Sequence, residues 1–228
     1  MKPRQILLIV AVAVVIAAAA IFLLLKPALS PTLPQTAATA SSPATPPAPS
    51  GTDSELMVAG PLGEKTLGDP KAPNTVIEYA SMTCTHCQRF NNTVFKQFKA
   101  KYIDTGKVYY IFREFPLDPL ATSASMLARC APPDRYFAVV DLLYEKQSDW
   151  AFVQDPESAL RDLMKQVGFS QADFDTCLKN QTILDGVNWV KDRAAQKFSI
   201  DGTPTFFFNG QKKEGEQTLE DIDKILAG

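Results

Sequence analysis

The feature that most restricts the fold of this 228-residue chain is a Cys-x-x-Cys motif at residues 84–87, set between a predicted strand and a predicted helix. Residues 75–80 (TVIEYA) are β-branched and apolar with little alternation, which is typical of a central strand. Apolar residues then recur at helical spacing over residues 88–102, and residues 107–113 (KVYYIFR) predict a second strand. Strand, helix and strand with short joints predict a βαβ unit with a parallel, right-handed crossover.

The position of the motif gives its first cysteine a distinctive setting. Cys84 would stand at a helix N-terminus, where unpaired backbone N–H groups and the positive end of the helix dipole stabilise a thiolate. His86 could add positive charge or a hydrogen bond. Cys87 would lie one turn further in and be less exposed, so it could resolve a mixed disulfide on Cys84. The alternative is a zinc knuckle completed by Cys130 and Cys177. These two cysteines are far apart in the sequence, whereas four-cysteine zinc sites usually contain two close pairs, so redox chemistry is favoured and no metal is expected.

The middle of the chain, residues 119–197, has no strand signal. It consists of Ala-, Leu- and charge-rich stretches divided by Pro-Pro, Asp-Pro and Gly. These stretches predict four or five helices, at residues 121–130, 136–146, 157–167, 171–179 and 184–198.

Strand signals return near the C-terminus. Residues 205–208 (TFFF) are aromatic, which is more typical of sheet core than of a ligand site, and Asn209-Gly210 predicts a hairpin turn into residues 211–215. Pro204 should stand at the first residue of its strand, because proline cannot donate to a β-ladder. A cis Thr203–Pro204 bond would leave nearby backbone groups free to pair with a bound peptide. A final helix is predicted after Thr218, as its N-cap.

The N-terminal part of the chain has a different composition. Residues 6–25 contain only Ile, Leu, Val, Ala and Phe, and this length is what a helix needs to cross a bilayer. The apolar cores of signal peptides are shorter, about 7–15 residues. Residues 1–26 are therefore expected to be a transmembrane anchor, with a cleaved signal segment as the alternative.

Residues 27–55, rich in Pro, Ala, Ser and Thr, predict an extended, semi-rigid linker. Lys2 and Arg4 precede the apolar run, so everything after Lys26 is expected to be exported. The linker would then hold the domain at residues 56–228 away from the membrane surface.

The charge balance disfavours one class of function. Of the 23 Lys and Arg residues three precede residue 51, whereas all 25 Asp and Glu residues follow it, so the domain is acidic. A nucleic-acid-binding domain of this size should show a basic surplus. No nucleic-acid partner is expected.

Three segments in this order resemble the DsbA-type thiol:disulfide oxidoreductases: residues 76–87 (VIEYASMTCTHC), 113–117 (REFPL) and 202–205 (GTPT). The resemblance covers nearly all of residues 56–228. It implies an α/β thioredoxin-like fold, a mixed sheet flanked by helices, with an all-helical domain inserted at about residues 118–186.

The resemblance also implies a function. The protein would be a periplasmic oxidant whose only redox group is its Cys-x-x-Cys disulfide, without any cofactor. The N-terminal apolar run would tether it to the inner membrane, and a monomer is expected. It would donate that disulfide to reduced or unfolded exported proteins. A DsbB-like, quinone-linked membrane protein would then reoxidise it.

Carried over to this sequence, the family assigns Cys84 as the nucleophile, Cys87 as the resolving cysteine and His86 as a stabiliser of the reduced thiolate. Pro204 would be a cis proline facing the site. Thr203 would contact the substrate and tune the reduction potential. The Thr-His dipeptide inside the motif departs from the more familiar Pro-His, which leaves the potential itself open.

Two further assignments keep alternatives. Glu78 matches a buried acid that accepts or relays the proton of Cys87, although a strand glutamate could also face solvent at a sheet end. Cys130 and Cys177 are expected to pair as a structural disulfide in an oxidising compartment. Two free buried thiols or a second relay site are the other possibilities.

Two other functions remain open for the same fold. One is a disulfide isomerase or reductase, in which the motif is kept reduced. The other is a tethered chaperone or binding module that uses the groove beside Pro204 without turnover.

Overall fold

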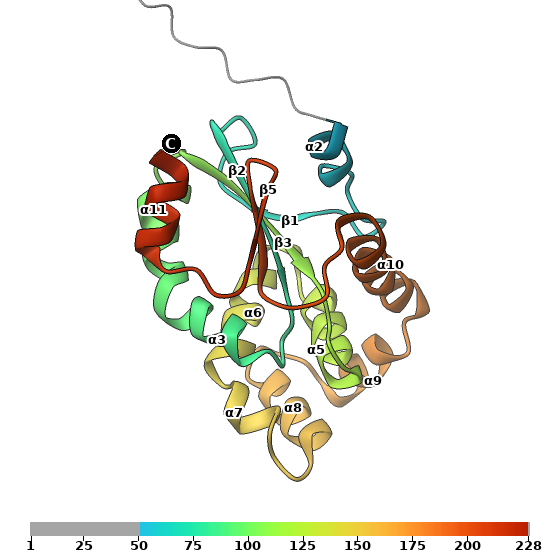
Figure 1. Ribbon diagram of the computed structural model, residues 1–228. Helices are drawn as coiled ribbons and strands as arrows, with labels where there is room; N and C mark the ends of the chain where they lie inside the picture. Colours follow the sequence, from blue (N-terminus) through green and yellow to red (C-terminus); the bar gives the residue numbers. More distant parts are fainter. Residues whose placement is uncertain (1–50, 228) are drawn as a thin grey trace, which may run out of the picture. The chain divides into compact units, whose positions relative to one another are not determined.

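The computed structural model describes residues 51–227, whose framework is a five-stranded mixed sheet (Figure 1). The strands follow the order β1-β3-β2-β4-β5 across the sheet. Their bounds are Lys65–Leu67 for β1, Asn74–Ala80 for β2, Val108–Glu114 for β3, Thr205–Phe208 for β4 and Gln211–Glu214 for β5. The thioredoxin-like α/β fold class is therefore confirmed.

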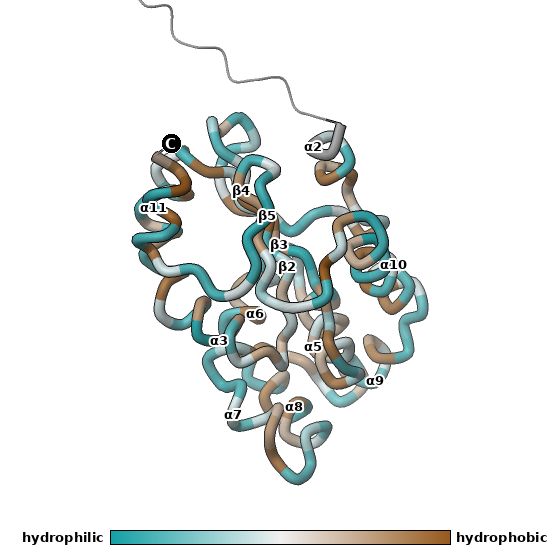
Figure 2. The backbone as a smooth tube through the Cα atoms, viewed as in Figure 1, coloured by the Kyte–Doolittle hydropathy of each residue, from teal (hydrophilic) through white to brown (hydrophobic). Residues whose placement is uncertain are grey.

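The predicted βαβ unit is present. Strands β2 and β3 pair in parallel along their whole length, from Asn74 opposite Val108 to Ala80 opposite Glu114. The predicted hairpin is present as well, with β4 antiparallel to both β2 and β5. The polar edge strand β5 has the colours of hydrophilic residues in Figure 2, whereas every residue of β4 is buried.

The helix after the motif begins earlier than the apolar spacing predicted. Helix α3 starts at Thr85 and ends at Phe90, and it continues through π-helical η1 (Asn91–Phe95), α4 (Lys96–Phe98) and π-helical η2 (Lys99–Ile103). The early start has a local cause, because the Cys84 sulfur accepts a hydrogen bond from the Cys87 N–H and so caps the helix. The wider π turn lets Phe90 and Phe95, five residues apart, enter the same core.

Most of the remaining helices come between β3 and β4 in the sequence. Their bounds are Pro119–Cys130 for α5, Pro133–Arg135 for η3, Tyr136–Glu145 for α6, Gln147–Trp150 for α7, Pro156–Lys165 for α8, Gln171–Leu178 for α9 and Gln181–Phe198 for α10, with α11 at Leu219–Ala227. The predicted end of the helical insertion, residue 186, falls inside α10, which runs unbroken to Phe198.

Helix α2 and strand β1 are among the elements that the sequence did not predict. Helix α2 spans Gly51–Leu56, so the last residues of the segment predicted as linker are helical, and Leu56 is buried in the core. Strand β1 is only three residues long and pairs with β3. A three-residue strand is too short to show an alternation of apolar and polar residues. Its position depends instead on β3, a partner distant in the sequence.

The sheet separates two apolar clusters. Val76 and Ala80 of β2 point into the larger cluster, which also contains Cys84 and Cys87. Ile77 and Tyr79 point into the smaller cluster on the opposite face. This alternation along one strand places the motif against the larger core.

Within the part of the chain that the structure describes, no helix has both the length and the apolar character needed to cross a membrane. The anchor predicted at residues 1–26, and the linker up to residue 50, lie outside the described residues. Both therefore stay predictions.

Candidate active site

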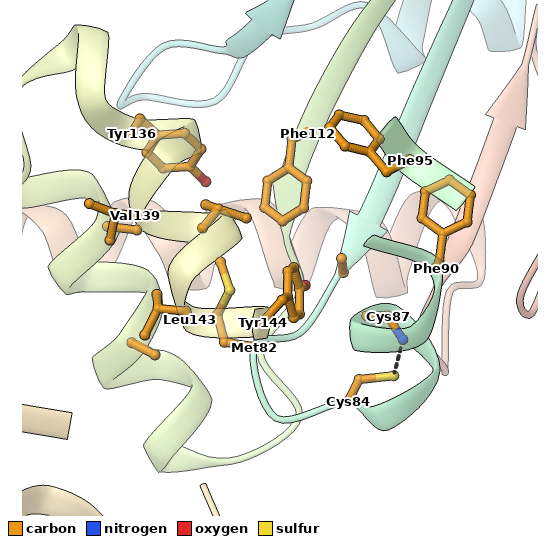
Figure 3. Close-up of a cluster of buried hydrophobic side chains, with 14 of the residues drawn as sticks. Met82, Cys84, Cys87, Phe90, Phe95, Phe112, Tyr136, Val139, Leu143 and Tyr144 are labelled. Carbon is orange, nitrogen blue, oxygen red and sulfur yellow. Dashed lines mark hydrogen bonds between the residues drawn. The ribbon is translucent and has the colours of Figure 1, made fainter. Parts of the chain in front are cut away.

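Cys84 is the N-cap of α3 (Figure 3). Its backbone is extended, with φ −76° and ψ 119°, and its sulfur accepts a hydrogen bond from the Cys87 N–H at 3.3 Å. The residue keeps 7% of its surface exposed, whereas Cys87 is completely buried. Both are free thiols. Only the first cysteine is therefore open to a reaction partner.

The two thiols differ strongly in acidity. The pKa of Cys84 is lowered to about 6, mainly by the side-chain hydrogen bond from Cys87, with help from Thr203 and from the N–H groups of Cys87 and His86, while burial opposes this shift. Burial raises the pKa of Cys87 well above its usual value, and the neighbouring Cys84 raises it further. One sulfur is thus a thiolate near neutral pH and the other holds its proton.

Thr203 and Pro204 lie next to the nucleophile, although 119 residues separate Thr203 from Cys84. The Thr203–Pro204 peptide bond is cis. The Cys84 thiol donates a hydrogen bond to the Thr203 carbonyl at 3.2 Å. The Thr203 hydroxyl is buried, and the Thr203 side chain helps to lower the pKa of Cys84. The segment at residues 202–205 therefore lies in contact with the Cys-x-x-Cys motif at residues 84–87.

Glu78 is buried beneath the motif, with 3% of its surface exposed. This excludes the solvent-facing alternative. The Tyr110 hydroxyl donates a hydrogen bond to Glu78 Oε2 at 2.6 Å. Burial raises the pKa of Glu78 to about 8, against the hydrogen bond from Tyr110, which lowers it, and the nearby Cys84 adds to the rise. A carboxyl group with this pKa can both give and take a proton near neutral pH.

The His86 side chain points to a different partner from the one predicted. Its ring is largely exposed, and Nδ1 lies 3.4 Å from Glu216 Oε2, which also accepts a hydrogen bond from Arg89 at 3.0 Å. The interaction of His86 that helps to lower the pKa of Cys84 comes from its backbone N–H. The role of the imidazole beside the thiolate therefore stays a prediction, and the structure adds a contribution from the His86 main chain.

Comparison with known proteins now decides the family. A model of the family described as thioredoxin matches residues 62–227. The chain belongs to the thioredoxin family. Solved alpha-DsbA1 from Wolbachia pipientis is 34% identical, with a TM-score of 0.70 over 77% of this chain and 94% of that chain. This neighbour assigns the chain to the DsbA-type proteins within the family.

Two curated relatives agree with that assignment. A Rickettsia typhi protein named as a protein-disulfide oxidoreductase is 32% identical over 72% of this chain and 60% of its own length. A Bacillus cereus protein named as disulfide bond formation protein D is 28% identical over 72% of this chain and 79% of its own length. This DsbA-type chain thus spans about 60% of the length of the Rickettsia relative.

In this thioredoxin-family chain, the loop before the nucleophile is held by two residues that the sequence analysis missed. The buried Gln147 amide donates hydrogen bonds to the carbonyls of Met82, at 2.8 Å, and Cys84, at 3.1 Å. The Tyr144 hydroxyl donates to the Ser81 carbonyl at 3.2 Å, and its ring lies beside Met82 in Figure 3. Both side chains come from the helical region, α6 and α7, so that region supports the active-site loop. No sequence pattern marks a glutamine for this role.

Asp118 holds the same loop from another side. One of its carboxylate oxygens caps α5 by accepting the Ala121 N–H at 2.8 Å, and the other accepts the Thr83 hydroxyl at 2.5 Å. Asp followed by Pro is a recognisable helix start, so the cap could have been found from the sequence. The contact of Asp118 with Thr83, the residue before the nucleophile, could not have been found from the sequence.

Cys130 and Cys177 lie apart from the motif and are bonded to each other. Their disulfide joins the last residue of α5 to α9, with Cα atoms 6.1 Å apart. Because each sulfur is already bonded, these two cysteines do not complete a zinc knuckle with the motif. The bridge ties together two helices of the region that supports the active-site loop.

Proposed function

We propose that the protein is a thiol:disulfide oxidoreductase that donates the Cys84–Cys87 disulfide to client proteins through a mixed disulfide on Cys84. The observation that carries this proposal is the difference between the two sulfurs. Cys84 is slightly exposed, with its pKa lowered to about 6, and Cys87 is buried with its pKa raised. A dithiol whose reduced form contains a stabilised thiolate holds its disulfide weakly and tends to give it away.

The first step opens the disulfide of the protein. A client thiolate attacks Cys84 Sγ, the bond between the two protein sulfurs breaks, and its electron pair goes to the Cys87 sulfur. Cys87 then takes up a proton, for which the nearby protonated Glu78 is the proposed donor. The product is a mixed disulfide between the client and Cys84.

The second step releases the client. A second client thiolate attacks the client sulfur of the mixed disulfide, and Cys84 leaves as a thiolate. Its low pKa makes it the better leaving group. The client loses two electrons and gains a disulfide, while the protein ends as the Cys84 thiolate and the Cys87 thiol. Thr203 and Pro204 would bind the client backbone beside this exchange.

We infer that this reaction takes place outside the cytoplasm. The apolar run at residues 6–25, the cations before it and the Cys130–Cys177 disulfide all support an oxidising compartment. The clients would be reduced exported proteins in the periplasm, with the domain tethered to the inner membrane by residues 1–26. A DsbB-like, quinone-linked membrane protein would then accept the two electrons and reoxidise the Cys84–Cys87 pair. The oxidoreductase itself would act as a monomer.

The test uses the oxidised full-length protein in detergent and a reduced, unfolded client with several cysteines. We expect stoichiometric loss of client thiols and its abolition by Cys84→Ala. When reduced Cys87→Ala is mixed with the disulfide-bonded form of the client, Cys84 should attack that disulfide and stay trapped as the mixed disulfide. Cys130→Ser/Cys177→Ser is the matched control and should keep the activity. Full activity in Cys84→Ala would overturn the mechanism.

The same preparation separates the other functions. An isomerase or reductase would be found reduced at residues 84 and 87 in growing cells, as read by alkylation. A chaperone or binding module would protect a client equally well after Cys84→Ser/Cys87→Ser. Either result would contradict the oxidase proposal.

A further inference from the structure

Glu78 and Tyr110 form a buried pair across two neighbouring parallel strands. Tyr110 of β3 is opposite Val76 of β2, two residues before Glu78, so both side chains lie on the same face of the sheet. Both residues are buried, with 3% and 2% of their surfaces accessible. The hydroxyl reaches Glu78 Oε2 at 2.6 Å. Among the described residues, Tyr110 is the hydrogen-bond partner of the Glu78 carboxyl group.

The Tyr110 ring is fixed by aromatic neighbours. The centroid of its ring lies 5.1 Å from that of Phe95, 6.1 Å from that of Phe98 and 6.4 Å from that of Phe137. These contacts involve the ring and not the hydroxyl. Replacing Tyr110 by Phe should therefore leave the packing in place and remove only the hydrogen bond.

The surroundings of Glu78 show what this hydroxyl can do. The sulfurs of Cys84 and Cys87, at the start of α3, interact electrostatically with Glu78, and so does the Tyr144 hydroxyl of α6. These three residues belong to the same buried cluster as Tyr110. On the β4 side its cross-strand neighbour is Phe206, which has no titratable group. Burial raises the pKa of both Tyr110 and Tyr144 well above the usual value, so both phenols keep their protons. Tyr110 is thus a constant donor to one carboxyl oxygen.

We propose that Tyr110 is a positioning residue for proton transfer at Cys87: its hydroxyl holds Glu78 Oε2 and leaves Oε1 to exchange a proton with the Cys87 sulfur. This inference rests on the proposed oxidoreductase function. When the disulfide opens, the protonated Glu78 gives its proton to the Cys87 thiolate. On reoxidation the Cys84 thiolate first attacks the disulfide of an oxidant and forms a mixed disulfide, with release of one thiolate. The Glu78 carboxylate then takes the proton from the Cys87 thiol, and the Cys87 thiolate attacks Cys84 Sγ and displaces the second thiolate of the reduced oxidant.

Tyr110 also sets the pH range in which this exchange works. A donor to the carboxylate favours the charged form and opposes the effect of burial. Without it, Glu78 would stay protonated to higher pH and act as a base only in alkaline solution. Hydrogen bonds to charged groups are strong enough to change such an acid constant about tenfold or more.

The first measurement is independent of catalysis. Full-length protein with carbon-13-labelled glutamate is titrated by NMR, and Glu78→Gln assigns the Glu78 signal. We expect Tyr110→Phe to raise the pKa of Glu78 by about one unit, a tenfold change in its acid constant. Tyr136→Phe is the matched control, because it removes a buried phenol that donates to another buried carboxylate, Glu114. It should leave the Glu78 signal unchanged.

The second measurement follows Cys87. The reduced protein is mixed with oxidised glutathione, and closure of the disulfide from the Cys84–glutathione mixed disulfide is timed over a range of pH. Tyr110→Phe should slow closure about tenfold at neutral pH and move its pH profile to the alkaline side. Glu78→Gln should slow it at least as much, and adding Tyr110→Phe to Glu78→Gln should change nothing more.

The outcomes separate the two proposals. An unchanged Glu78 titration or an unchanged pH profile in Tyr110→Phe, with Cys84→Ala inactive, would overturn the role of Tyr110 and leave the function standing. Full activity in Cys84→Ala would overturn both. Equal slowing at every pH, without a shifted profile, would show a purely structural contribution and would also contradict the inference.

Discussion

In its protonated form, the Cys84 thiol donates a hydrogen bond to the carbonyl of Thr203 at 3.2 Å, across 119 residues of sequence. This contact joins the N-terminus of α3 to the cis proline segment before β4. The backbone that would bind a client is therefore in direct contact with the nucleophile. A client that pairs with the segment at residues 203–204 would have its cysteine placed at the reacting sulfur.

The reduction potential of the Cys84–Cys87 pair should change its pH dependence near pH 6. Below the pKa of Cys84, which is about 6, two protons accompany two electrons, and the potential should fall by about 59 mV per pH unit. Above it only Cys87 takes up a proton, so the slope should become about 30 mV per unit. Equilibration with glutathione at several pH values measures this. A slope that stays near 59 mV up to pH 8 would contradict the lowered pKa.

The stability of the reduced protein should show the same thiolate. The pKa of Cys84 is about 6 in the folded chain against an ordinary 9.0, so this group stabilises the fold fully above pH 9 and loses its contribution as pH falls to 6. The pKa of Glu78 is raised from 4.5 to about 8, so its contribution to stability has the opposite pH dependence: it is present below pH 4.5 and is lost as the pH rises to 8. The difference in unfolding free energy between wild type and Cys84→Ala isolates the cysteine, and it should grow from pH 6 to pH 9.

His86→Ala should change the pKa of Cys84 by less than about half a unit. The ring is exposed and pairs with Glu216, and interactions between exposed charges are weak. Thiolate absorbance in the ultraviolet, titrated in both proteins, gives the comparison. A rise of one unit or more would instead support the imidazole role that the family resemblance implies.

Gln147→Leu should destabilise the fold and loosen the loop before Cys84. The substitution leaves the buried carbonyls of Met82 and Cys84 without the amide that donates to both, at a cost of about 1–3 kcal/mol. Urea unfolding measures this cost. Gln171→Leu is the matched control, because its exposed amide bonds only Asp175 one helical turn away, and it should have little effect. Equal effects of the two variants would refute the support role of Gln147.

Cys130→Ser/Cys177→Ser should lower stability without removing the redox activity. Loop-closure entropy for a bridge with a sequence separation of 47 gives roughly 4 kcal/mol. Denaturant unfolding of the oxidised proteins measures the loss. The alkylation rate of the reduced Cys84 thiol should stay close to that of wild type. A double variant with unchanged stability but altered Cys84 reactivity would point to a relay role for this pair.

The sequence by itself determined the elements that depend on local patterns. Apolar runs and their spacing predicted β2, β3 and β4 and most of the helices, and Asn209-Gly210 predicted the hairpin. The order of strand, Cys-x-x-Cys motif and helix predicted a thiolate at Cys84. These predictions hold because a strand period, a helix terminus and a tight turn each involve residues close together in the chain.

Only the tertiary structure decided how the site is supported. Burial of Glu78, its hydrogen bond from Tyr110, the pairing of His86 with Glu216 and the hold of Gln147 on the loop each join residues far apart in sequence. Such contacts depend on which side chains meet once the sheet and helices have packed, and no local period encodes that. The sequence therefore placed the two sulfurs of the motif, while the packing set the contacts that determine their acidity and buried Glu78 beneath them.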